Sequence, residues 1–139
     1  MASEPADEEV ARDEHAAIPE LHELEFAVME QSWRLGRVTV QEVLDGLNSA
    51  DPRQRRYTTI LSVMRRLHQK GFLDRERHDR TDFYTPIISR ERYAHAQTRA
   101  ALGHLVDQYG EVALAHFARQ VESLSLEHLA KLRELAEEP

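Results

Sequence analysis

Between residues 57 and 73, hydrophobic side chains recur at intervals of three and four, which is the period of an α-helix with one buried face. The buried positions of this predicted helix are Ile60, Leu61, Met64 and Leu67. Its opposite face is polar and basic, with Thr58, Thr59, Ser62, Arg65, Arg66 and Gln69. Because glycine commonly follows the last residue of a helix, we predict that the helix ends at Gly71.

Two further helices precede this one. Residues 21–35 carry two adjacent apolar stripes, Leu21, Leu24 and Val28 on one and Phe26, Met29 and Trp33 on the other. A helix with two such stripes is buried from two sides, so we place it at the centre of a small bundle with Trp33 in the core. After Gly36 and a short strand at Val38, Thr39 and Glu42 form a capping box that opens the next helix. That helix ends in a turn at residues 48–52.

A β-hairpin follows the basic helix. Residues 72–77 and 82–87 alternate as strands do, and the polar segment 78–81 between them carries Arg80 at its tip. A helix-turn-helix followed by a hairpin is a winged-helix arrangement, in which the third helix enters the DNA major groove and the wing reaches a flanking phosphate or the minor groove.

Beyond Pro86, three amphipathic helices are predicted at residues 90–109, 112–121 and 126–135, the first capped by Ser89. Three such helices with no sheet to cover could hardly form a core alone, so we expect them to interdigitate with the same helices of a second subunit. An intramolecular bundle packed back on the first domain is the alternative. The expected dimer interface consists of Leu102, Leu105, Val106, Tyr109, Leu114, Phe117, Val121, Leu129 and Leu132.

Charge is segregated along the chain. Residues 53–82 contain nine Lys or Arg and four Asp or Glu, a local charge of +5 in a chain whose total is −7. A basic block on one helix and hairpin is the usual electrostatic footprint of a nucleic-acid binder, although a solvated helix face gives the same pattern. Residues 1–20 hold seven acidic residues and one arginine. We expect them to form a mobile arm. This arm is either simply a solvated tail or a segment that competes with DNA for the basic helix.

The expected organisation is therefore an acidic arm at residues 1–20, a winged-helix DNA-binding domain at 21–88 and a helical dimerisation domain at 89–139. The fold class is mainly α with a small β-wing. Within it, the candidates for phosphate contacts are Arg53, Arg55, Arg56, Lys70 and Arg80, which would position the protein without reading sequence. The candidates for base edges are Thr58, Thr59, Ser62, Arg65 and Arg66. Capping of the helix start is a second possible role for Thr58 and Thr59.

Several classes of function are disfavoured. The chain has no glycine-rich phosphate loop and no nucleophile motif, so we expect no enzyme activity and no cofactor. It has no cysteine, which excludes disulfides and thiolate metal sites. Histidines at 95, 104 and 116 lack chelating spacing, so we expect surface histidines and no metal site. No apolar run approaches the ~20 residues that span a bilayer, and no leader signal is present, so we expect a cytoplasmic protein without membrane insertion.

The motifs of this chain, in their order, resemble the penicillinase and methicillin-resistance repressor family (BlaI/MecI/CopY type). The resemblance rests on LHELEFAVM at residues 21–29 with Trp33, YTTILSVMRRL at 57–67, Lys70-Gly71, Asp79-Arg80 and Tyr84-Thr85-Pro86. It covers residues 21–88 well and the C-terminal helices more loosely. Carried over by position, it implies that Thr58, Thr59, Ser62 and Arg66 face the major groove and that Arg80 contacts the backbone. Ser62 stands where the family often has threonine.

The resemblance implies a homodimeric repressor that binds an inverted-repeat operator in double-stranded DNA, often its own, and is released by an inducing signal. In the β-lactam branch that signal leads to cleavage of the repressor, so an inducer-linked protease is an expected partner. The copper branch senses metal through C-terminal cysteines, which this chain lacks. Two alternatives remain from the residues themselves: a winged helix that binds only proteins, and a DNA-binding regulator whose C-terminal helices sense a small molecule or a metal.

Overall fold

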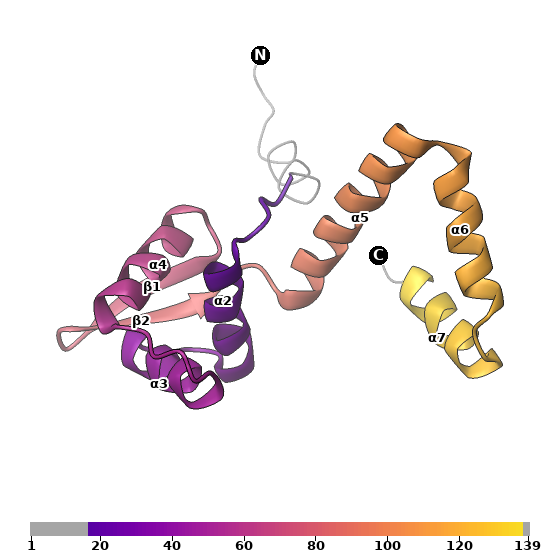
Figure 1. The fold of residues 1–139 in the computed structure, drawn as a ribbon. Helices are drawn as coiled ribbons and strands as arrows, with labels where there is room; N and C mark the ends of the chain where they lie inside the picture. The colour runs from indigo at the N-terminus through magenta and orange to yellow at the C-terminus, as the bar shows by residue number, and fades with distance from the viewer. Residues whose placement is uncertain (1–16, 138–139) are drawn as a thin grey trace, which may run out of the picture. The chain divides into compact units, whose positions relative to one another are not determined.

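The computed structural model describes residues 17–137, so most of the acidic arm predicted at residues 1–20 lies outside the described residues. The chain divides into two compact units, the first ending at Gln97 and the second beginning at Thr98. Figure 1 shows the elements of both units along the chain. Within residues 17–137, no helix is long and apolar enough to cross a membrane.

The first unit opens with two helices, α2 (Glu23–Leu35) and α3 (Val40–Ala50). The predicted capping box at the start of α3 is confirmed: the hydroxyl of Thr39 accepts from the Glu42 N–H at 3.2 Å, and a Glu42 carboxylate oxygen accepts from the Thr39 N–H at 2.8 Å. Two backbone donors that a helix start leaves unpaired are thereby satisfied. Between the helices, Val38 forms the predicted short strand as an isolated bridge to Tyr84.

Helix α4 (Tyr57–Gln69) is the basic helix of the sequence, and its buried residues are Ile60, Val63, Met64 and Leu67. Gly71 follows it with a φ of +85°, a left-handed conformation that glycine adopts without steric cost, as expected for the residue that ends a helix. Leu61 is only half-buried rather than buried, and it packs against the edge of the core.

The wing consists of β1 (Leu73–His78) and β2 (Thr81–Pro86), paired antiparallel in a two-stranded sheet. The strands are shifted by one residue from the predicted ranges, because His78 and Thr81 pair across the ladder and leave a loop of two residues. These two residues, Asp79 and Arg80, have φ values of 48° and 70°. Two consecutive positive φ values match the tight hairpin turns whose twist suits that of the flanking strands.

The hydrophobic core lies entirely between the elements of the first unit and the beginning of α5 (Arg90–Tyr109). Tyr93 from the first turn of α5 packs among Phe26, Trp33 and Phe72, with ring centroids 5.9 to 6.0 Å apart. Trp33, predicted in the core, is half-buried at its edge and donates its indole N–H to the Ile88 carbonyl at 2.9 Å. This packing explains why the first unit extends past residue 88, into α5.

The second unit comprises the rest of α5 with α6 (Glu111–Glu122) and α7 (Leu126–Glu137). All three helices begin and end close to the predicted residues. Among the residues that the structure describes, α6 and α7 have none that is buried. Their apolar side chains are therefore exposed or half-buried within a single chain. That a separate dimerisation domain begins at residue 89 stays a prediction.

Candidate nucleic-acid interface

The polar face of α4 is defined by helix geometry. Residues spaced by three or four lie on one face, and the face opposite the buried residues carries Thr58, Ser62, Arg65 and Gln69. A neighbouring flank carries Thr59, Arg66 and Lys70. As whole residues all seven are exposed, although the side chain of Lys70 is only 30% exposed. The sequence predictions for this helix thus fall on an accessible surface, and Gln69, which was not among the candidates for base contacts, belongs to the same row.

The loop before α4 carries three of the predicted phosphate ligands, Arg53, Arg55 and Arg56. Its backbone is fixed by the side chain of Asn48, whose Oδ1 accepts from the Arg55 N–H at 2.8 Å and whose Nδ2 donates to the Arg55 carbonyl at 3.2 Å. Arg53 and Arg56 are exposed and Arg55 is half-buried. The N-cap residue of α4 is Arg56, so neither Thr58 nor Thr59 occupies the capping position.

The wing presents further cations. Arg80 lies at the tip of the hairpin, where its positive φ turns the chain. Arg37, at the start of the short strand before α3, lies over the ring of Phe83 at 4.0 Å from its centroid and pairs with Glu76 at 3.3 Å. Arg77 pairs with Asp82 at 3.0 Å. Sequence reasoning missed Arg37, because it is separated from the basic block and only the fold brings it to the wing.

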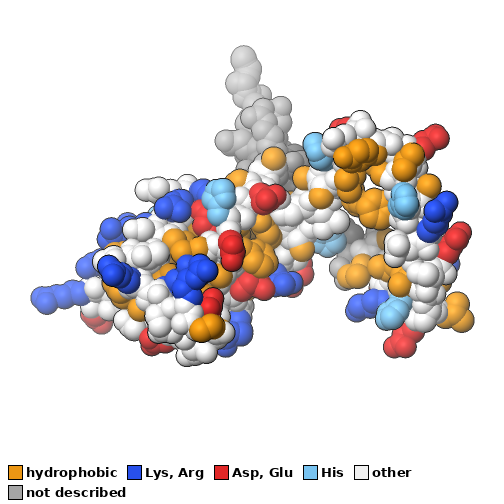
Figure 2. Space-filling model, viewed as in Figure 1, with side chains coloured by type: hydrophobic (Ala, Val, Ile, Leu, Met, Phe, Trp, Pro, Cys, Tyr) orange, Lys and Arg blue, Asp and Glu red, His pale blue; other side chains and the backbone are white. Residues whose placement is uncertain are grey.

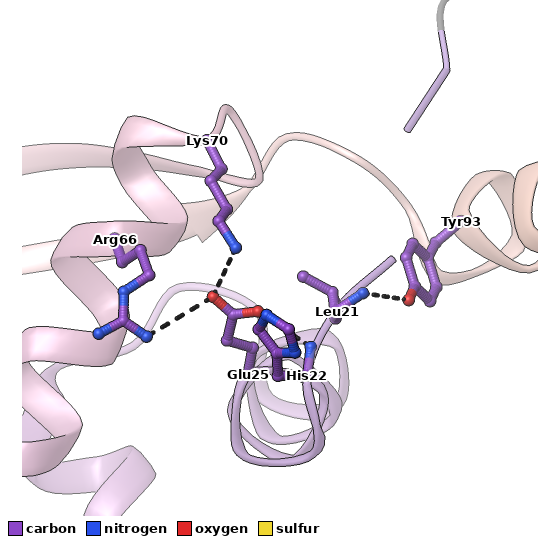
Figure 3. Close-up of polar contacts among 6 residues, drawn as sticks. All are labelled: Leu21, His22, Glu25, Arg66, Lys70 and Tyr93. Carbon is purple, nitrogen blue, oxygen red and sulfur yellow. Dashed lines mark hydrogen bonds and ion pairs between the residues drawn. The ribbon is translucent and has the colours of Figure 1, made fainter. Parts of the chain in front are cut away.

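A buried carboxylate connects α2 to the far end of α4. Glu25 is 1% exposed, and one of its oxygens accepts from the Lys70 ammonium at 2.8 Å and lies 3.8 Å from the Arg66 guanidinium (Figure 3). Burial by itself raises the pKa of the Glu25 carboxyl, but the hydrogen bonds from Lys70 and from the His22 N–H, together with the positive charge of Lys70, lower it below its ordinary value of 4.5. Glu25 is therefore ionised at neutral pH.

Lys and Arg side chains gather on the first unit, including the projecting end of the hairpin (Figure 2). Within residues 17–137, no group of three or more His, Asp or Glu side chains is arranged to hold a metal ion. A helix-turn-helix whose third helix, α4, has a basic exposed face, followed by a two-stranded wing with Arg80 at its tip, defines the first unit as a winged-helix DNA-binding domain.

Comparison with known proteins places this domain in a family. The sequence profile described as "Penicillinase repressor" matches residues 21–138, which is most of the chain. The chain therefore belongs to the penicillinase repressor family and is a DNA-binding transcriptional repressor, as the resemblance in its motifs implied.

Two relatives agree with this assignment by their sequences. The chain is 32% identical over 108 residues to the transcriptional regulator BlaI of Mycobacterium tuberculosis, covering 76% of this chain and 77% of that protein. It is 25% identical over 121 residues to the penicillinase repressor of Bacillus licheniformis, covering 87% of this chain and 92% of the relative. A solution structure of the DNA-binding domain of the repressor BlaI is 29% identical with a TM-score of 0.48, covering 55% of this chain and 90% of that chain.

The residues predicted for a dimer interface lie on the three C-terminal helices. Phe117 on α6 is 41% exposed and Tyr109 at the end of α5 is 57% exposed. Val106 and Leu129 are half-buried. The remaining predicted residues, all exposed, are Leu102, Leu105, Leu114, Val121 and Leu132. Rows of exposed apolar side chains on consecutive helices commonly mark a protein–protein interface.

Proposed function

We propose that this repressor binds an inverted-repeat operator as a homodimer, with α4 of each subunit in the major groove and the wing against the DNA backbone. The observation that carries this proposal is the exposed polar face of α4 directly opposite its buried face. A helix that packs one face on a core and presents short polar and arginine side chains on the other can enter the major groove without losing its support.

The base-reading set that we propose is centred on Arg65, Ser62 and Thr58, with Thr59 and Arg66 on the flank. An arginine can donate two hydrogen bonds to a guanine edge, and the threonine methyl group can contact a thymine methyl. Each good base contact contributes ~1–3 kcal/mol of discrimination. The phosphate set comprises the arginines of the loop before α4, namely Arg53, Arg55 and Arg56, together with Arg80 at the wing tip.

Dimerisation through α5–α7 would give the repressor two recognition helices for two half-sites about one turn of DNA, ~34 Å, apart. The exposed apolar side chains of these helices support this part of the proposal, because burying them against a second copy removes apolar surface from water.

A fluorescence-anisotropy titration tests DNA binding directly. The duplex from the region upstream of the protein's own coding sequence and a scrambled duplex of equal length are titrated at several salt concentrations. We expect the upstream duplex to bind at least ~10³-fold more tightly than the scramble. Equal, steeply salt-dependent binding of both would move the operator elsewhere, and no binding to either would favour a winged helix that binds only proteins.

Two variants separate the roles of the proposed residues. Arg65→Ala should weaken binding to the upstream duplex by ~1–3 kcal/mol and relax base preference. Arg80→Gly should weaken binding to both duplexes alike and lower the salt slope by about one. Glycine is a suitable replacement because the φ of Arg80 is 70°, a conformation that glycine adopts without steric cost. Equal effects of both changes on every duplex would contradict this division.

We also propose that an inducing signal releases the repressor, through a protease that acts on the C-terminal helices. Family membership supports this step. Cleavage there would separate the two subunits, so that each recognition helix would bind its half-site alone. A site for a specific protease inserted between α5 and α6, at residue 110, tests the consequence, because cleavage there removes the proposed interface residues of α6 and α7. Cleavage should weaken operator binding while leaving half-site binding unchanged. Unchanged operator binding by the cleaved chain would contradict it.

A further inference from the structure

Lys70, a predicted phosphate ligand, is already engaged by a carboxylate of its own chain. It is the C-cap residue of α4, and its ammonium lies 2.8 Å from a carboxylate oxygen of Glu25. Its side chain is only 30% exposed, whereas the side chain of Arg66 one turn earlier is 52% exposed. Lys70 is thus already paired with Glu25 in the protein without DNA.

Glu25 is held in place independently of Lys70. It is the third residue of α2, and its other carboxylate oxygen accepts from the His22 N–H at 3.0 Å, which closes the start of that helix. The glutamate side chain is buried between α2 and α4 and cannot turn to solvent without losing this bond (Figure 3). A fixed, buried anion attracts a neighbouring cation more strongly than exposed anions do, because the surroundings screen it less.

A lysine engaged in this way contributes little to phosphate binding. Its charge is compensated at short range, and transfer of its ammonium to a phosphate would leave an uncompensated carboxylate in the core. Arg66 lies at 3.8 Å from the same oxygen and would compensate it only in part. The arginines of the loop before α4 and of the wing tip have no share in this cluster.

We propose that Glu25 is a positioning residue that withholds Lys70 from DNA phosphates and thereby limits sequence-independent binding. This inference rests on the proposed DNA binding by α4. Without the negative charge at position 25, the ammonium of Lys70 would be free to swing outward along the flank of the recognition helix and contact the backbone. Each added phosphate contact releases counterions and makes the logarithm of affinity fall more steeply with the logarithm of salt concentration, by about 0.9 per contact.

The test measures that salt slope for the full chain on a scrambled duplex by fluorescence anisotropy. Glu25→Gln keeps the size of the side chain and an acceptor for the His22 N–H while removing the charge. We expect tighter binding at low salt and a slope steeper by about 0.9. The double variant Glu25→Gln/Lys70→Gln removes the anion and the cation together, and its slope should equal that of the unchanged protein.

The matched control is Glu30→Gln. It removes the same charge from the same helix, at a half-buried glutamate that pairs with Arg90 of α5 at 2.7 Å rather than with a cation of α4. Its slope should stay that of the unchanged protein, so a steeper slope in this control would attribute the effect to net charge and overturn the inference.

The outcomes distinguish this inference from the proposed function. If the unchanged protein binds neither duplex, the DNA-binding proposal itself fails. If it binds but Glu25→Gln leaves the slope unchanged, Glu25 does not withhold Lys70. A double variant whose slope is shallower by about one would show that Lys70 already contacts phosphate, and would overturn the inference even if Glu25→Gln did not fold. A merely structural role of Glu25 would lower stability without steepening the slope.

Discussion

The hydroxyl oxygen of Tyr93, in the first turn of α5, accepts a hydrogen bond from the backbone N–H of Leu21 at 2.8 Å. The two residues are 72 positions apart, and both are buried. One turn further along α5, the Gln97 side-chain amide donates to the Ile18 carbonyl at 2.6 Å. The segment before α2 is thus fastened to the beginning of α5, which makes this part of α5 integral to the DNA-binding unit.

Tyr93→Phe tests this connection. The substitution keeps the aromatic packing and leaves the Leu21 N–H buried without its acceptor, which costs about 1–3 kcal/mol. We expect the free energy of unfolding to fall by that amount in urea denaturation followed by circular dichroism. Tyr57→Phe, at an exposed position at the start of α4, is the control and should leave the free energy of unfolding unchanged. A Tyr93→Phe protein as stable as the parent would show that the hydrogen bond contributes nothing.

Tyr84→Phe, unlike Tyr93→Phe, should not lower the free energy of unfolding. Tyr84 is fully buried at the centre of the wing, and its hydroxyl has no hydrogen-bond partner among residues 17–137. A buried polar group without a partner costs about 1–3 kcal/mol, so its removal should leave the protein as stable as before or more stable by up to that amount. The same urea denaturation measures the free energy of unfolding of this variant. Marked destabilisation would indicate that the hydroxyl has a partner, such as a buried water molecule.

The acid stability of the protein should depend on Glu25. The pKa of its carboxyl is lowered in the folded state, because hydrogen bonds and the charge of Lys70 outweigh the opposing effect of burial. The stability that comes from a lowered carboxyl pKa is present above the ordinary value of 4.5 and is lost as the pH falls through the folded-state value. The unchanged protein should therefore lose more stability than Glu25→Gln on acidification below pH 4.5. Parallel stability curves for the two proteins between pH 7 and pH 3 would contradict this.

The elements of the fold that sequence predicts are those specified by neighbouring residues. Thr39 and Glu42 predict their capping box because both partners lie within one helical turn. Gly71 predicts the end of α4 for the same reason, since its left-handed conformation is a local property. The strand ranges of the hairpin were off by one residue, because a polar segment of four residues does not reveal which of them pair.

The site was predicted less completely, because its electrostatics depend on residues far apart in sequence. The exposed arginines and threonines of α4 followed from helical periodicity. The pairing of Lys70 with Glu25 spans 45 residues, and nothing in the spacing of either residue indicates it. Arg37 reaches the wing only through the bridge between Val38 and Tyr84. The support of Arg55 by Asn48 could have been suspected, since an asparagine in a turn commonly bonds to nearby backbone.

The proposed dimer gives the last prediction. Phe117 is 41% exposed on α6, although aromatic side chains of its size are usually well buried. If it packs at the centre of a subunit interface, Phe117→Asp would bury an unpaired charge there and should convert the dimer to a monomer. Sedimentation velocity at micromolar concentration measures the mass, and the control is Arg119→Glu, at an exposed residue on the opposite face of the same helix. The monomer should also bind the operator more weakly while retaining half-site affinity, because α4 is unchanged. A Phe117→Asp protein that sediments with the same mass as the unchanged protein would exclude this face of α6 from the interface.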